Sequence, residues 1–185
     1  MPNRLTKIYT RKGDQGATSL GNGERVEKVS KRISVLGDFD ELNCLIGIIL
    51  SDELDEVTTK ILIDIQHVLF DVGGEVSVPG KIFITSKYVT FIEEMIDRLN
   101  LKLGNLKEFI LPGGGRSAST CHYARAVCRR SERELIHLSK QEAINEQTLK
   151  LLNRLSDLLF VLARTLAKNE NKIEQMWNKK HWREK

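Results

Sequence analysis

The sequence is poor in the residues that interrupt helices or cross-link a fold. Its 185 residues include only three prolines, at positions 2, 79 and 112, so long stretches are free to be helical. The three cysteines, Cys44, Cys121 and Cys128, form an odd number and have no CxxC spacing. This pattern excludes a disulfide framework and a zinc site built from thiolates, and we expect a reducing, cytoplasmic setting.

Long apolar runs are also lacking. The longest, Cys44–Leu50, is far shorter than the roughly 18 residues that a membrane span needs. No apolar segment follows the basic residues near the N-terminus, so we expect neither a secretory signal nor a membrane partner. With 41% hydrophobic and 29% charged residues, the chain is typical of a globular protein. Its length predicts a single domain over residues 1–185.

Charges of the two signs occupy different parts of the chain. Residues 1–32 carry eight basic and three acidic side chains (+5), residues 33–110 six and fourteen (−8), and residues 111–185 fifteen and eight (+7). Basic ends are one mark of nucleic-acid binding. However, dense Lys/Arg runs are missing and only 6% of residues are aromatic, so we expect no nucleic-acid partner. Pairing between acidic and basic helices, within or between subunits, or a small polyanionic ligand fits better.

Five segments repeat apolar residues every three or four positions, which is the spacing of a helix with one buried face. They cover residues 32–52, 54–76, 86–103, 116–138 and 145–168. The sequence therefore predicts an all-α fold, a five-helix bundle with ferritin-like up-down packing over residues 33–168. Residues 1–32 contain four glycines and no helical stripe, which predicts a loop-rich N-terminal arm. The polar tail, residues 169–185, is expected to be partly disordered.

The arm carries a candidate anion-binding loop over residues 10–19. Gly13 and Gly16 allow a tight turn in which successive backbone N–H groups point inward. The loop also contains cationic and hydroxyl donors, those of Thr10, Arg11, Lys12, Thr18 and Ser19. The GK[ST] ending of a Walker A loop is absent. A surface β-turn with solvated charges is the alternative interpretation.

The fourth predicted helix carries a ladder of arginines. Arg125, Arg129 and Arg133 are spaced by four and climb one side of the helix. Like charges at this spacing repel by roughly 0.2–0.5 kcal/mol per pair. Because the ladder borders the apolar face, its cations need anionic partners. The partner is either a bound phosphate chain or a structural network with the carboxylates of Asp38, Asp40, Glu41 and Glu132.

The fifth predicted helix places Asn153 and Asp157 on the same side. An asparagine among leucines must be hydrogen-bonded, either to an adenine or ribose or, more commonly, within the bundle. The four histidines lack HxxxH or HExxH spacing, so we expect no metal held by the protein alone. No nucleophile–base constellation is evident, which favours a reaction whose reactive centre belongs to a ligand.

Five ordered motifs carry a resemblance to a known family. They are KIYTRKGDQG (residues 7–16), DELN (40–43), FILPGG (109–114), RAVCRRSER (125–133) and LNRLSD (152–157). On these motifs the chain resembles the PduO-type ATP:cob(I)alamin (corrinoid) adenosyltransferases over about residues 5–168. Two departures are visible: residues 37–39 read Gly-Asp-Phe where members often have Gly-Thr-Val, and Gly115 extends the turn. Both bear on corrinoid affinity and spare the charged positions.

The resemblance implies an activity and an assembly. Members of the family are five-helix bundles that assemble as homotrimers with ATP between adjacent subunits. They transfer the 5′-deoxyadenosyl group of ATP to the cobalt of cob(I)alamin, forming adenosylcobalamin and releasing triphosphate. Magnesium is expected with ATP. An electron-donating reductase and an adenosylcobalamin-dependent enzyme are implied as protein partners.

The resemblance also implies roles for residues. Asp40 is expected to pair with Arg125 across the subunit interface, and these two residues with Arg129 are the expected catalytic set. Phe109 corresponds to the aromatic residue that displaces the lower axial ligand of the corrinoid. The residues implied to hold ATP are Thr10, Arg11, Lys12, Gly13, Thr18, Ser19, Lys28, Arg129, Arg130, Glu132, Arg133 and Asn153.

Two other functions compete with this interpretation. A non-catalytic bundle that carries or senses a nucleotide or corrinoid would bind the same ligands without turnover. A nucleic-acid-binding protein would be retained on DNA in a manner that weakens steeply with salt.

Overall fold

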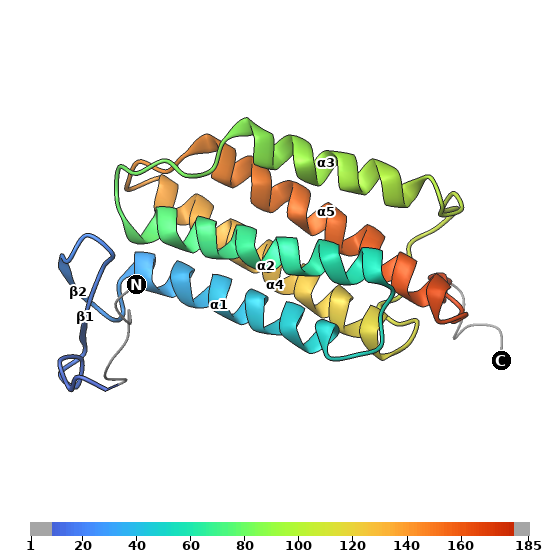
Figure 1. Ribbon diagram of the computed structural model, residues 1–185, viewed down its shortest axis with the longest axis horizontal. Coiled ribbons are helices and arrows are strands. Elements are labelled where there is room, and N and C mark those ends of the chain that lie inside the picture. Colours follow the sequence, from blue (N-terminus) through green and yellow to red (C-terminus); the bar gives the residue numbers. More distant parts are fainter. Residues whose placement is uncertain (1–8, 180–185) are drawn as a thin grey trace.

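The structure is a computed structural model that describes residues 9–179, and helices dominate it (Figure 1). The helices are α1 (Lys31–Leu50), α2 (Glu56–Ser77), α3 (Ser86–Asn100), α4 (Arg116–Ser139) and α5 (Glu146–Asn169). They lie side by side along the longest axis of the molecule. The predicted all-α five-helix bundle is confirmed, and every helix boundary lies within three residues of its predicted position. No helix in the described part of the chain is long and apolar enough to cross a membrane.

The most deeply buried helix is α5, which packs against both α3 and α4, while α4 packs against α1 and α1 against α2. Its leucines face neighbours on several sides and are fully buried from Leu151 to Leu162. Cys121 and Cys128 of α4 are fully buried against this helix, and each thiol contacts a backbone carbonyl of α5. Burial raises the pKa of both thiols, so they remain protonated and act as core residues.

The arm contains a small hairpin that the sequence did not indicate. Strands β1 (Ala17–Ser19) and β2 (Arg25–Glu27) pair antiparallel, with Thr18 opposite Val26. Three residues are too few for an alternating pattern to be recognised. The hairpin lies beyond one end of the bundle (Figure 1). It is attached there by Leu20, which is buried, and by a hydrogen bond from Gly21 N to Ser77 O (2.8 Å) at the end of α2.

The first part of the polar tail lies along the segment before α4, while partial disorder of the tail as a whole stays a prediction. Residues 170–179 leave the end of α5 and turn back along residues 109–111. Leu111 N donates to Gln175 O (2.9 Å) and Trp177 N donates to Phe109 O (2.7 Å). Backbone pairing of this kind leaves no apolar periodicity in the sequence. The polar composition of the tail therefore gave no sign of it. Residues 180–185 lie outside the described residues.

A buried carboxylate connects α2, the segment before α3 and the start of α5. Glu75 is only 5% exposed. One of its oxygens accepts hydrogen bonds from Phe83 N (2.7 Å), Ile84 N (2.8 Å) and Asn145 Nδ2 (3.1 Å). The other accepts from the hydroxyl of Thr148. Three of its partners are N–H donors and the fourth is a hydroxyl, so both oxygens of the buried carboxylate are hydrogen-bonded.

We therefore predict that Glu75→Gln lowers the free energy of unfolding by about 1–2 kcal/mol, because a neutral amide oxygen accepts weaker hydrogen bonds than a carboxylate and the Thr148 hydroxyl must turn from donor to acceptor. Urea denaturation measures the change. The matched control is Glu53→Gln at an exposed position, which should change stability by less than about 0.5 kcal/mol. Equal unfolding midpoints for the two variants would contradict this account of Glu75.

Candidate active site

Phe109 and Arg125 meet at one open cavity of about 630 Å³. Its walls come from the segment before α4, from α4 and from α5, and include His122, Asp157 and Phe160. The Phe109 ring is 78% exposed on its rim. The cavity thus combines aromatic and aliphatic surface with two cations, Lys107 and Arg125, and two anions, Glu108 and Asp157, which suits a large ligand with an apolar face and polar edges.

Inside this cavity, Arg125 is half-buried and lacks an anionic partner. Its guanidinium lies over the Phe160 ring, 5.5 Å from the centroid, and no carboxylate among residues 9–179 forms an ion pair with it. The buried His122 is one turn away, 6.1 Å from the same ring. Burial and the positive charge of Arg125 lower the pKa of His122, so the imidazole is neutral at pH 7. Arg125 is therefore a cation available for a partner outside this chain.

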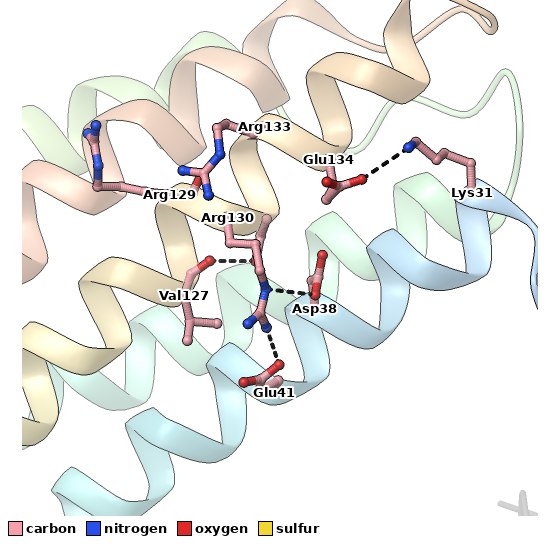
Figure 2. A network of polar contacts seen from close by, with 9 residues as sticks. Lys31, Asp38, Glu41, Val127, Arg129, Arg130, Arg133 and Glu134 are labelled. Atoms are coloured by element: carbon pink, nitrogen blue, oxygen red, sulfur yellow. Dashed lines mark hydrogen bonds and ion pairs between the residues drawn. The ribbon is translucent and has the colours of Figure 1, made fainter.

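The arginines of α4 divide between two sides of the helix (Figure 2). Arg130 points toward α1, where its Nε donates to Asp38 Oδ1 (3.2 Å) and its Nη2 pairs with Glu41. Arg129 and Arg133 point away from α1 and are exposed. Arg133 Nη1 donates to Arg129 O (2.9 Å), while the guanidinium of Arg129 makes no hydrogen bond within the described residues.

The carboxylates of Asp38 and Glu41, which the sequence offered as partners of the arginine ladder, thus pair with Arg130 instead. The role of Arg130 in holding ATP, which the resemblance implies, stays a prediction. Arg129 and Arg133 remain available for an anion.

Glu132 and Asn153, both implied in ATP binding, are brought together by α4 and α5. Asn153 Nδ2 donates to Glu132 Oε1 (3.0 Å), and Asn153 Oδ1 accepts from Arg154 Nη1 (2.7 Å). Arg154 in turn pairs with Glu93 of α3 (3.0 Å). Both the NH2 group and the oxygen of the Asn153 amide are thus hydrogen-bonded within the chain. This matches the alternative interpretation, in which the asparagine is a structural residue of the bundle.

The candidate anion-binding loop and Lys28 lie together in the arm. Lys28 N donates to Gly16 O (2.8 Å), and a Cβ placed on Gly13 would lie 3.1 Å from Lys28 Nζ. Arg11 (φ 60°) and Gly16 (φ 81°) both adopt left-handed conformations, which turn the loop sharply. The loop therefore presents an ammonium group beside glycine backbone, as an anion site requires.

Arg25 supports the same loop and was missed in the sequence. It donates to Lys12 O (2.8 Å) and to Ser19 Oγ (3.3 Å), across the hairpin. Ser19 lies opposite Arg25 in the hairpin, so a contact between their side chains is expected from the strand pairing. The sequence did not predict this pairing because the two strands are too short to show an alternating pattern.

Two pairs of predicted site residues are not joined within the chain. Asp40 is exposed and lines a separate cavity between α1 and α2 with Asn43 and Phe70, and this cavity shares no lining residue with that of Arg125. No hydrogen bond or ion pair within the described part of the chain links residues 10–28 to α4. Residues 9–179 contain no group of three or more His, Cys, Asp or Glu side chains that could hold a metal ion.

Comparison with known proteins gives a consistent result. Residues 8–166 match the family model described as cobalamin adenosyltransferase. The chain is 48% identical over 180 residues to a cobalamin adenosyltransferase of Cupriavidus metallidurans, covering 97% of this chain and 98% of that protein. It is 38% identical over 187 residues to the corrinoid adenosyltransferase MMAB of Homo sapiens, covering 95% and 75%.

A solved structure has the same fold. It is a phenylalanine-to-alanine variant of a PduO-type ATP:corrinoid adenosyltransferase from Lactobacillus reuteri, complexed with cobalamin and ATP. It matches with a TM-score of 0.87 and 33% identity, over 93% of this chain and 99% of that one. Both the sequence and the fold thus lead to one conclusion: the chain belongs to the cobalamin adenosyltransferase family and is of its PduO type.

Proposed function

We propose that the chain transfers the 5′-deoxyadenosyl group of ATP to the cobalt of cob(I)alamin, forming adenosylcobalamin and releasing triphosphate. The observation that carries this proposal is the cavity in which Phe109 and the unpaired Arg125 meet, one helical turn from the free guanidinium of Arg129. The relative from Lactobacillus reuteri, with cobalamin and ATP bound, supports it.

The chemistry explains why the site has no nucleophile of its own. Cobalt(I) attacks the 5′ carbon of ATP, the C5′–O bond breaks, and its electron pair leaves with triphosphate. Catalysis then consists of holding the two substrates in line and stabilising the negative charge that develops on the leaving group. Arg129 and Arg133 supply cations that form no ion pair within residues 9–179, and Lys28 with the loop of the arm supplies an ammonium and N–H groups. Magnesium is expected to arrive with ATP, since it commonly binds through substrate phosphates.

Phe109 serves the corrinoid end of the site. Its exposed ring takes the place of the lower axial ligand and excludes water from that face of the cobalt. Loss of this ligand makes cobalt(II) easier to reduce, so an electron-donating protein of the cytoplasm can supply cob(I)alamin. Transfer of the product to a dependent enzyme belongs to the same proposal.

The active site is completed between subunits of a homotrimer. Within residues 9–179 of one chain no hydrogen bond or ion pair joins the arm to α4, and Asp40 and Arg125 line different cavities. Head-to-tail contact between subunits that closes into a ring would bring both pairs together at each interface. The pairing of Arg125 with Asp40 of the neighbour would also give this half-buried cation its partner.

The experiment that tests the function is turnover. Incubation with ATP, magnesium and chemically reduced cobalamin should yield adenosylcobalamin and triphosphate in equal amounts, followed by the cobalamin absorbance and by chromatography. Tight binding of both ligands without product would instead favour a carrier or regulator.

Arg129→Ala should lower kcat/KM at least tenfold, which is about 1.4 kcal/mol of transition-state stabilisation, without changing the unfolding midpoint. Arg130→Ala is the matched comparison. It breaks the contacts with Asp38 and Glu41, which are partly exposed, and should cost about 0.5–1 kcal/mol of stability. Its effect on turnover should be the smaller of the two. A folded, trimeric Arg129→Ala enzyme with normal turnover would remove Arg129 from the site.

Asp40→Asn should weaken turnover with cobalamin much more than it weakens ATP binding. A confined Arg125 that loses its partner costs a few kcal/mol, while the phosphate-binding residues keep their places. Combined with Arg125→Ala, the loss should be less than additive, because both substitutions remove one interaction. A double-mutant cycle on turnover and trimer stability measures this coupling. Strictly additive losses would show that the two residues act independently.

A further inference from the structure

Arg164 is a buried cation that holds two segments at one point. It lies on α5 and is 6% exposed. Its Nη2 donates to Gly104 O (2.9 Å), in the segment that leads from α3 toward Phe109. Its Nε donates to Glu174 Oε1 (3.1 Å), in the tail. Removing either partner from a buried guanidinium is costly, so this contact fixes both segments on α5.

These two segments are the ones that frame Phe109. Directly after Glu174, the tail pairs with the Phe109 segment through Leu111 N–Gln175 O (2.9 Å) and Trp177 N–Phe109 O (2.7 Å). The Phe109 ring is 78% exposed, so its own packing contributes little to holding the segment in place. The backbone of Phe109 is therefore positioned mainly by the tail, and the tail is secured by Glu174.

The far side of the same segment is also fixed to the end of α5. A Cβ on Gly114 would lie 2.7 Å from Ala167 Cβ, and one on Gly115 would lie 2.4 Å from Glu170 Oε2. The approach of Gly114 to Ala167 leaves no room for a side chain, and both glycines have a positive φ (93° and 102°), so the turn before α4 packs directly onto the end of α5. The last turns of α5 thus hold the segment of Phe109 from both sides, and Arg164 supplies the charged contacts.

We propose that Arg164 and Glu174 are positioning residues for Phe109: their ion pair holds the tail that sets where the phenylalanine ring stands at the cavity. Neither residue lines that cavity, and the only lining group that senses the charge of Glu174 among the described residues is His122, whose pKa the carboxylate raises against the larger lowering effect of burial. The inference rests on the proposed function, and specifically on Phe109 displacing the lower axial ligand.

This role makes the ion pair important for one route into the reaction and not for the other. When the enzyme starts from cob(II)alamin, the lower ligand must leave before a one-electron donor such as a reduced flavin converts cobalt(II) to cobalt(I). When the enzyme is given cobalamin that is already chemically reduced, cobalt(I) has no axial ligand to displace. Loss of the ion pair should therefore affect the first route selectively.

The test uses Glu174→Gln, which keeps the size of the side chain and removes its charge. The matched control is Gln175→Ala, the next residue of the tail, whose side chain is exposed and whose carbonyl is retained. Both adenosylation routes are measured, with reduced flavin and with prereduced cobalamin. EPR of the ATP-bound enzyme reports how much cob(II)alamin has lost its lower ligand.

For Glu174→Gln we expect the flavin-driven rate to fall at least about tenfold while the rate from prereduced cobalamin stays within about twofold. The EPR signal of cob(II)alamin without its lower ligand should shrink in parallel, and the control should behave as wild type. Equal losses on both routes, or no loss on either, would overturn the proposal. Failure of the wild-type protein on both routes would instead overturn the proposed function.

A second pair of variants tests the same proposal without disturbing the buried ion pair of Arg164 and Glu174. Trp177→Pro removes the N–H that donates to Phe109 O, whereas Trp177→Ala keeps it. Both retain Arg164 and Glu174. The proline variant should lose more of the flavin-driven rate than the alanine variant, with prereduced cobalamin still converted. Identical rates for the two variants would show that backbone pairing with the tail does not position Phe109.

Discussion

The attachment of the N-terminal arm to the end of α2 is the constraint on which the active site depends. Leu20 is buried there and Gly21 N donates to Ser77 O, so the loop with Lys28 stays at that end of the molecule. Arg129 lies on the side of α4 that faces away from α1, and no polar contact joins the arm to α4 within the described residues (Figure 2). We propose that one chain presents two half-sites for an anion and that a second subunit unites them.

The same division explains the separation of charge along the sequence. Part of the match between the acidic middle and the basic flanks is satisfied inside the chain, as in Arg154–Glu93 (3.0 Å) and Arg130–Asp38 (3.2 Å). Arg125 and Asp40 are among the leftover charges, since neither forms an ion pair within the described residues, and they line different cavities. We propose that these leftover charges direct how subunits meet, since opposite charges at an interface fix its register.

The sequence predicted the helices well because each has a continuous apolar face, and helical periodicity is a strong signal over 15 or more residues. It could not separate Arg130 from Arg129, although neighbouring positions on a helix differ by about 100°. The sequence analysis also missed the structural roles of Glu75 and Arg164, although the residue pattern around them indicates buried charges. Each is a single charge inside an apolar stripe, which in a stable bundle requires buried partners. The hairpin and the tail depend on backbone pairing between short segments, which leaves no periodic trace.

The most direct test of the shared site is subunit complementation between Lys28→Ala, which lacks the ammonium of the arm, and Arg129→Ala, which lacks the cation of α4. Each variant alone should be impaired at limiting ATP. If each site takes its arm and its α4 from different subunits of a closed ring, random mixed trimers regain about a quarter of the wild-type sites. Co-expressed and co-purified trimers should then be clearly more active than either variant. Activity no higher than the average of the two variants would contradict the account, because it would mean that the arm and α4 of one chain form the site together.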